Sequence, residues 1–365
     1  MTYEKFSITV IIPVFGRADL LKRLLVNLKN NQVTYEVIVV DNSSAGTKEQ
    51  IKSICEFEDA FYIYLNQSVS AKRNIGAWKA KSDFLLFLDS DCEPAQGLLD
   101  AHLEYWKNAS EKMIGALGVL EMVGRQNLLL KIINHSALLK PFQWAKANSY
   151  VPWGPTANFT VKRDLFLKIN GFDEQLSPPS TGGEDVEFGL RARSKGYSIG
   201  CVRNALVFHS TETWLNFKDV VKRLWMWGKG DAELLRRFPQ NLLYNPPLLS
   251  SQFMFLFVFS LLMCLISNNL GWVFLSFLWV LLVVFSNACI NYFSGQAPYG
   301  CMVPFIYLIL DCSRIFHGGI KGLAYIYYRF DFNENHFDEW KEIAMDQWIQ
   351  HLSAFVILIL FSFIS

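Results

Sequence analysis

The chain has 365 residues, enough for one α/β domain of about 250 residues and a smaller second region. Its net charge of +1 gives no basic field of the kind that attracts nucleic acid. Only 18% of residues are charged and 52% are apolar, and no charged residue or histidine occurs between Arg237 and Asp311. Such a stretch excludes a protein that is soluble over its whole length.

The first two thirds of the chain alternate apolar strands with amphipathic helices. Continuous apolar strands that are separated by helices predict a parallel sheet covered on both faces. In such sheets ligands bind beyond the carboxyl ends of the strands. The predicted strands are Ile8–Phe15, Tyr35–Asp41, Phe61–Leu65 and Phe84–Asp89, and the helices between them are Ala18–Asn31, Thr47–Phe57 and Ser70–Lys81.

Seven cysteines are scattered along the chain without a C-x-x-C pair, so we expect reduced thiols and no zinc site. Residues 1–7 lack the charged and apolar regions of a signal peptide. We therefore expect the first domain, residues 1–245, to stay in the cytosol and residues 246–365 to form a membrane domain.

Long uncharged segments predict the membrane spans, because about 20 apolar residues cross a bilayer as a helix. The expected spans are Pro246–Ile266 and Trp272–Ile290, which form a hairpin, and Trp348–Ile364. Met302–Tyr328 is apolar but carries Asp311 and Arg314, and charges at mid-bilayer are costly. We expect this segment to be interfacial or re-entrant, with its charged residues marking a functional or protein-facing surface.

Basic residues precede the first span, and the loop after that span has none. The positive-inside rule then predicts a multi-pass protein of the inner cell membrane with a cytoplasmic N-terminal domain. The segment Arg223–Pro239 is rich in Trp and Arg. It either gates the active site or holds a lipid phosphate, or it is only an interfacial belt of aromatic residues and basic anchors.

The motif FLDSDCEP places Asp89 and Asp91 just past a predicted buried strand. Two carboxylates that face one point repel each other unless a cation lies between them, and Mg²⁺ or Mn²⁺ prefers such oxygen ligands. The pair therefore predicts a divalent-cation site that also binds a diphosphate. The alternative is a solvated acidic loop.

Six motifs together resemble family 2 glycosyltransferases: VIIPVFGR, VIVVDNSS, AKRNIGAWKA, FLLFLDSDCEP, NFTVKRDLFLKINGFDE and GGEDVEFGLRARSKGY. The resemblance covers about residues 7–209. It implies a GT-A fold, which is a Rossmann-like nucleotide-diphospho-sugar transferase domain of the α/β class, followed here by the C-terminal transmembrane helices. It also implies inverting transfer from a nucleotide-sugar with a divalent cation, Mn²⁺ or Mg²⁺.

The resemblance also implies roles for particular residues. In the family, the Asp of the "ED" pair is the base that deprotonates the acceptor hydroxyl, which here is Asp185, with Glu184 as its neighbour. The cation ligands are Asp91, Asp89 and, as in some relatives, His209. The acceptor side includes Trp153, Gly182 and Gly183. The donor side includes Pro13, Phe15, Arg17, Asp41, Lys72, Arg73, Asn74 and Asp89.

Each role has a structural alternative. Asp41 suits an Asx-turn with Asn42 and Ser43. Arg73 suits an ion pair on a solvated helix, and the acidic pair at 184–185 suits a helix N-terminus. A lone His209 is more often structural, and Trp153 suits a core position.

The predicted function is transfer of a sugar from a nucleotide-sugar, with a UDP-sugar favoured, to a lipid-linked or membrane-associated acceptor in cell-surface glycan or glycolipid synthesis. One alternative is a processive polysaccharide synthase. The Q-x-x-R-W motif of such enzymes is absent, and its nearest match, VVKRLWMW, lacks the Gln. Another alternative is a non-catalytic membrane scaffold that binds nucleotide-sugar, against which Asp89, Asp91 and Asp185 argue.

Overall fold

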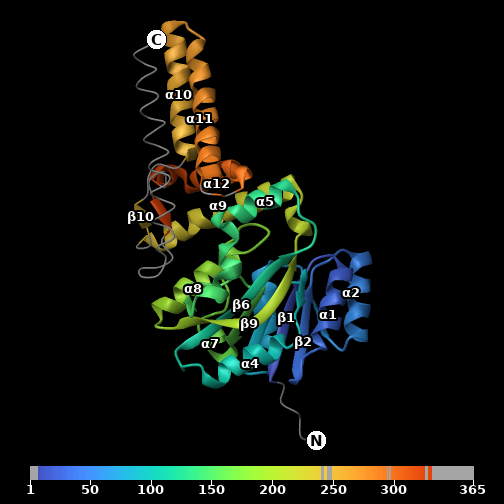
Figure 1. The fold of residues 1–365 in the computed structure, drawn as a ribbon. Helices are drawn as coiled ribbons and strands as arrows, with labels where there is room; N and C mark the ends of the chain where they lie inside the picture. The colour runs from blue at the N-terminus through green and yellow to red at the C-terminus, as the bar shows by residue number, and fades with distance from the viewer. Residues whose placement is uncertain are drawn as a thin grey trace, which may run out of the picture. The chain divides into compact units, whose positions relative to one another are not determined.

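The computed structural model describes residues 7–239, 242–244, 249–293, 295, 297–324 and 328–330. The chain divides into two compact units (Figure 1). The first comprises residues 1–126 and 138–214, and the second residues 127–137 and 215–365. The predicted span Trp348–Ile364 lies outside the described residues, and the predicted domain boundary at residue 245 stays a prediction.

Four parallel strands form the first half of the sheet in the first unit, in the order β3-β2-β1-β4. Their apolar side chains fill the core, since every residue of β1 is buried. This half agrees with the sequence prediction. The strands are β1 (Ile8–Val14), β2 (Tyr35–Asp41), β3 (Phe61–Tyr64) and β4 (Phe84–Leu88), connected by α1 (Ala18–Leu28), α2 (Ala45–Phe57) and α3 (Val69–Lys79).

Beyond β4 the sheet is mixed. Strand β8 is antiparallel to both β4 and β6, β9 is parallel to β6, and β5 and β7 are antiparallel to β9. The predicted parallel arrangement therefore applies only to the first half. The second half contains β5 (Cys92–Pro94), α4 (Leu98–Asn108), β6 (Met113–Val123), η1 (Ala137–Gln143), α6 (Trp144–Ala147), β7 (Tyr150–Val151), β8 (Asn158–Lys162), α7 (Arg163–Lys168), η2 (Glu174–Leu176), α8 (Glu184–Ser194), β9 (Ser198–Ser210) and η3 (Glu212–Trp214).

A bulge interrupts the pairing of β6 with β9. Gly118 lies opposite Val202, but the next residue of β6, Val119, lies opposite Leu206. Residues 203–205 therefore have no partner on β6. The buried side chain of Asn158 closes this gap, because its Nδ2 donates to the carbonyls of Val119 and Ala205 at 3.0 Å each.

The second unit contains the apolar helices. α10 (Leu249–Ser267) and α11 (Gly271–Phe293) form the predicted hairpin and lie side by side (Figure 1). By length and composition, Gly271–Phe293 and Tyr299–Gly319 are long and apolar enough to cross a membrane. The unit also contains α5 (Leu128–His135), α9 (Phe217–Arg237), η5 (Pro298–Met302), α12 (Val303–Ala324) and the antiparallel pair β10 (Leu242–Tyr244) and β11 (Tyr328–Phe330).

Asp311 and Arg314 of α12 face protein within this unit. Arg314 pairs with Asp231 on α9 and, at 3.2 Å, with Asp311 one turn away on its own helix. Asp311 and Arg314 are 5% and 8% exposed. Gly228 on α9 lets this helix approach α12 closely, because a Cβ at this position would overlap the carbonyl oxygen of Leu310 on α12. Of the two predicted meanings of these charges, the structure shows a protein-facing surface.

Candidate active site

Arg73 connects the two acidic motifs of the first unit. Its Nη2 donates to Oδ1 of Asp89, just after β4, at 2.7 Å, and its Nη1 donates to Oε1 of Glu184, at the start of α8, at 3.0 Å. The arginine side chain is 3% exposed and that of Glu184 is 8% exposed. The sequence alternative of a solvated ion pair is therefore wrong, because this guanidinium is buried between two carboxylates.

Close packing of α3 against the sheet positions Arg73. Gly76 lies one turn further along α3, where a Cβ would lie 2.6 Å from Cγ2 of Ile11 on β1. Ser68 caps the helix, since its Oγ accepts from the backbone N–H of Ala71 at 3.3 Å. The buried face of α3 therefore carries Lys72 and Arg73 toward the sheet rather than toward solvent.

The acidic pair at the start of α8 has perturbed proton affinities. Burial, reinforced by the negative charge of Asp185, raises the pKa of Glu184, and Arg73 opposes this rise. Burial also raises the pKa of Asp185 to about 6, against the backbone N–H of Val186, which donates to its Oδ1 at 2.9 Å. A carboxylate whose pKa lies near neutrality is suited to take a proton from an alcohol.

Gly183 sets the start of α8. Its φ of 98° lies in the left-handed region that glycine adopts without strain. Glu184 and Asp185 follow at once in the first helical turn, where the helix dipole favours negative charge. The alternative of a helix N-terminus is therefore confirmed, while the role of the partly exposed Asp185 as a base stays a prediction.

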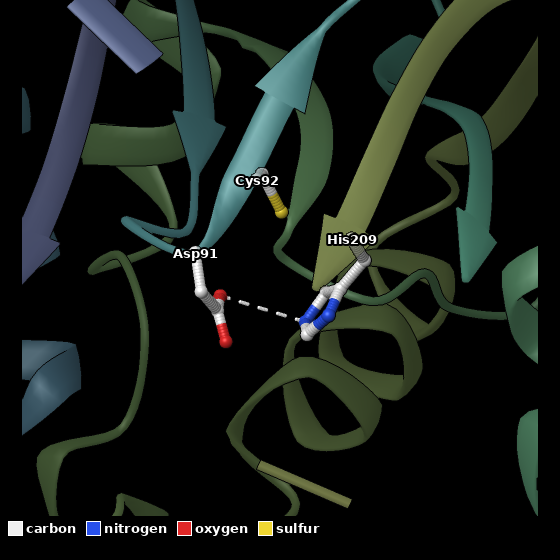
Figure 2. A group of neighbouring side chains, drawn as sticks. All are labelled: Asp91, Cys92 and His209. Atoms are coloured by element: carbon white, nitrogen blue, oxygen red, sulfur yellow. Dashed lines mark ion pairs between the residues drawn. The ribbon is translucent and has the colours of Figure 1, made fainter. Parts of the chain in front are cut away.

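Asp91, Cys92 and His209 form a second cluster at the start of β5 and the end of β9 (Figure 2). One ligand atom from each lies within 4.8 Å of the others. Nε2 of His209 lies 3.6 Å from Oδ1 of Asp91, while its Nδ1 lies 3.0 Å from the carbonyl oxygen of Ser210. The set of oxygen, nitrogen and sulfur donors fits a divalent cation.

Two predicted donor residues, Asp41 and Lys72, form hydrogen bonds near the carboxyl ends of β1 and β2. Asp41 is fully buried, and its carboxylate accepts from Ser43 N at 2.8 Å, Ser43 Oγ at 2.5 Å and Tyr62 OH at 2.9 Å. Nζ of Lys72 donates to the Val14 carbonyl and to Asn42 Oδ1, both at 2.8 Å. Asp41 therefore forms the predicted Asx-turn, and its contact with a base or ribose stays a prediction.

The other predicted donor residues surround the end of β1. Pro13 is buried within the strand, whereas Phe15 is 73% exposed directly after it. Arg17 pairs with Glu212 at 3.0 Å, and both side chains are largely in solvent. The ring of Phe15 is therefore exposed at the strand end, the guanidinium of Arg17 is paired there, and contact of either residue with a nucleotide stays a prediction.

Asn74 and Trp153 form contacts with protein groups near the acceptor motifs. Asn74 binds the backbone of Phe172 in both directions at 2.9 Å and donates to Glu174 Oε1 at 3.0 Å. Trp153 packs edge-on against Trp144, with ring centroids 5.2 Å apart, and is partly exposed. Gly182 is buried beside Gly183. The structure thus gives Asn74 a positioning contact that the motif alone did not reveal.

Cys92, Ser43 and Asn42 were not among the site residues predicted from the sequence. Cys92 reaches His209 only because β5 pairs with β9 in a register that places these two residues opposite each other. No periodicity in the chain encodes that register. Ser43 and Asn42 adjoin Asp41 in the motif VVDNSS, so the Asx-turn alternative was the available signal for them.

Comparison with known proteins indicates the protein family of the first domain. The sequence model of the family described as "Glycosyl transferase family 2" matches residues 9–166. These residues therefore form a domain of the glycosyltransferase family 2 type. The matched range contains Arg73, Asp89 and Asp91, and the predicted α/β fold class with apolar C-terminal helices is confirmed.

Curated relatives of this glycosyltransferase domain are themselves named glycosyltransferases. The pre-mycofactocin glycosyltransferase of Mycobacterium tuberculosis is 29% identical over 240 residues, which are 64% of this chain and 49% of that protein. Glycosyltransferase AglE of Haloferax volcanii is 27% identical over 248 residues, covering 64% of this chain and 76% of that protein. The chain therefore spans about half the length of the mycobacterial relative.

Two further similarities concern a lipid-linked substrate and a metal. A Campylobacter jejuni protein named GalNAc(5)-diNAcBac-PP-undecaprenol beta-1,3-glucosyltransferase is 30% identical over 176 residues, covering 47% of this chain and 56% of that protein. The solved mannosyltransferase PcManGT of Pyrobaculum calidifontis, in complex with GDP-Man and Mn²⁺, has a TM-score of 0.47 and 18% identity, covering 64% and 65% of the two chains.

Proposed function

We propose that the protein is an inverting glycosyltransferase that moves a sugar from a UDP-sugar to a lipid-linked or membrane-associated acceptor in cell-surface glycan or glycolipid synthesis. The observation that carries this proposal is the buried Arg73, which holds Asp89 of the donor motif and Glu184 of the acceptor motif within hydrogen-bond distance. A single guanidinium thus joins the predicted donor and acceptor carboxylates.

Asp185 is the proposed general base. Its raised pKa and partial exposure suit removal of a proton from an acceptor hydroxyl while that oxygen attacks the anomeric carbon. One displacement by that oxygen inverts the anomeric configuration. Arg73 and Glu184 are positioning residues in this proposal, because they fix the first turn of α8 relative to the Asp89 loop.

Asp91 and His209 are the proposed ligands of a divalent cation, Mn²⁺ or Mg²⁺. Their oxygen and nitrogen donors lie close enough to share one ion. When bound, such an ion neutralises charge on the departing nucleoside diphosphate as a Lewis acid. Asp89 already forms an ion pair with Arg73. We therefore propose that Asp89 orients the cation site and the donor, and that it is not a primary ligand of the ion.

The membrane assignment rests on the second unit. Two helices there are long and apolar enough to span a bilayer, and basic residues of α9 precede them, so we propose an inner-membrane protein with its catalytic domain in the cytoplasm. The relative named for an undecaprenol substrate supports an acceptor held at that surface.

The test uses the full chain in lipid nanodiscs with membrane lipid extract as acceptor source. UDP-, GDP- and dTDP-sugars are supplied with Mn²⁺ or Mg²⁺ and then with chelator, and release of nucleoside diphosphate is recorded. We expect one donor to be consumed, with chelator abolishing release. Analysis of product length separates single transfer from a processive synthase, and NMR of the product anomer tests inversion.

Asp185→Asn keeps the shape of the side chain and removes the base. We expect turnover to fall about 10²–10⁴-fold while calorimetry still detects donor binding. Glu104→Gln is the matched control, because Glu104 is an exposed carboxylate on α4 that pairs only locally with Lys107. Turnover of Asp185→Asn within tenfold of the wild type would refute the assignment of the base.

A further inference from the structure

The cluster of Asp91, Cys92 and His209 contains a sulfur ligand that a site for Mg²⁺ or Mn²⁺ does not need. Strand β5 runs antiparallel to β9 and sets Cys92 opposite His209, while Asp91 directly precedes β5. Figure 2 shows the thiol and the carboxylate directed toward the imidazole. Three different donor atoms therefore face one point.

The cluster is open to solvent on the side of Asp91 and closed by protein around Cys92 and His209. Cys92 is 1% exposed and His209 is 7% exposed, whereas the side chain of Asp91 is 17% exposed. The sulfur and imidazole thus form the closed end of the cluster, and the carboxylate lies at its entrance. An ion that enters past Asp91 meets the two inner ligands in a poorly hydrated environment.

The hydrogen bond of His209 prepares its second nitrogen for a metal. Nδ1 lies 3.0 Å from the carbonyl oxygen of Ser210, which can only accept, so Nδ1 carries the proton in that bond. Nε2 is then the ring nitrogen whose lone pair can bind a metal, and it is this atom that lies near Asp91. Such a second hydrogen bond fixes the tautomer of many metal-binding histidines.

The donor set favours ions that bind sulfur. Hard Mg²⁺ takes oxygen ligands in octahedral geometry, whereas Zn²⁺ takes thiolate, imidazole and carboxylate together in tetrahedral geometry. Zinc–ligand bonds of about 2.0–2.3 Å imply separations of about 3.3–3.7 Å between ligand atoms. The three ligand atoms here lie within 4.8 Å, so small side-chain rotations are enough to close the site.

We propose that Asp91, Cys92 and His209 bind a thiophilic divalent cation, Zn²⁺ or Cd²⁺, and that this ion inhibits sugar transfer. The proposal rests on the proposed function, in which Asp91 and His209 hold the catalytic ion. Binding exchanges the proton of the Cys92 thiol for a sulfur–metal bond and releases that proton to solvent. A tetrahedral ion with three protein ligands keeps one open position, too few for two oxygens of a diphosphate.

Cobalt reports the sulfur ligand directly. Co²⁺ is titrated into the full chain in nanodiscs, and the near-ultraviolet absorption of a thiolate–cobalt bond is recorded for the wild type, Cys92→Ser and Cys55→Ser. Cys55 is a matched control, because it is a buried thiol on α2 outside the cluster. We expect the band in the wild type and in Cys55→Ser, and its loss in Cys92→Ser.

Competition and inhibition complete the test. Zn²⁺ affinity is expected to fall at least about tenfold in Cys92→Ser, since even second-shell changes cost ~10–100-fold in metal affinity. Zn²⁺ is also expected to inhibit Mn²⁺-supported turnover of Cys55→Ser as it does that of the wild type. If Cys92→Ser does not fold, ¹¹³Cd NMR of the wild type distinguishes a sulfur-ligated ion from one bound by oxygen and nitrogen alone.

The outcomes separate this proposal from the proposed function. A cobalt band without Mn²⁺-dependent turnover supports the thiolate site and refutes the proposed function. Mn²⁺-dependent turnover without a cobalt band, or with a band unchanged in Cys92→Ser, overturns the thiolate site and leaves the transferase standing.

Discussion

Replacing Arg73 with Met removes the charge that neutralises Glu184 in the interior. Glu184 is 6% exposed, so its carboxylate, where it is ionised, is left as a buried anion without a basic partner. Breaking a buried pair in this way costs about 3–5 kcal/mol of unfolding free energy. Asp89 adds little, because its side chain is 31% exposed and water solvates it when Arg73 is lost.

The cost depends on pH with a defined sign. Burial and Asp185 already raise the pKa of Glu184 to about 8, and removal of Arg73 raises it further. Below that pH the variant protonates Glu184 and loses mainly hydrogen bonds, worth about 1–2 kcal/mol. Above it the wild type ionises Glu184 and gains the ion pair with Arg73, whereas the variant cannot, so the destabilisation grows as the pH rises through about 8.

Thermal unfolding in detergent, followed at pH 6 and pH 8.5, measures this cost. For a unit of about 200 residues, 3–5 kcal/mol lowers Tm by roughly 6–20 °C. Arg23→Met is the control, because Arg23 and Glu93 form an exposed pair worth less than about 1 kcal/mol. The double variant Arg73→Met with Glu184→Leu removes both charges, so its Tm should exceed that of Arg73→Met. A Tm for Arg73→Met that matches Arg23→Met at pH 8.5 would refute the reasoning.

Three further predictions concern α8 and the second unit. The raised pKa of Asp185 predicts that kcat/KM falls roughly tenfold per pH unit below about pH 6, where the base is protonated, and a profile flat to pH 5 would contradict this. Gly228→Leu forces α9 and α12 apart and should cost about 1–3 kcal/mol, seen as a lower Tm, whereas Gly46→Ala, which meets open space, should not. Arg314→Met removes the ion pairs with Asp231 and Asp311 and should expose α12 to limited proteolysis, with destabilisation of about 3–5 kcal/mol; unchanged cleavage would show that these ion pairs do not hold α12 in place.

The parallel half of the sheet was predictable because each strand is a short apolar run followed by its own helix. The second half was not, since β8 pairs with β4 and β6 by contacts between residues distant in sequence. Local composition carries no information about such pairings. The apolar helical hairpin of α10 and α11 was predictable for the same reason as β1, namely an uninterrupted apolar run of suitable length.

The motifs of the candidate site were predictable from the sequence, but the hydrogen bonds that join these motifs were not. Asp89 and Glu184 belong to recognisable sequence patterns, yet their common partner depends on how closely α3 approaches the sheet at Gly76. The sequence analysis considered Arg73 either a donor contact or a surface ion pair, because burial of one helix face cannot be read from a segment with mixed polarity. Cys92 went unnoticed because its partner is set by strand register.

The pairing of β9 with β6 resumes after the bulge, so the face of the sheet on which His209 lies depends on how many residues separate it from the bulge. Residues 203–205 are the extra length between the paired segments Ile199–Val202 and Leu206–Ser210. Side chains alternate between the faces of a strand, so removing one residue beyond the bulge would turn His209 to the opposite face of the sheet. A deletion there would thus take the cluster of Asp91, Cys92 and His209 apart while all three residues stay in the sequence. Homologues that keep these residues but differ in the number of residues between the bulge and His209 should be sorted by that number, and not by their residues, when metal binding is inferred.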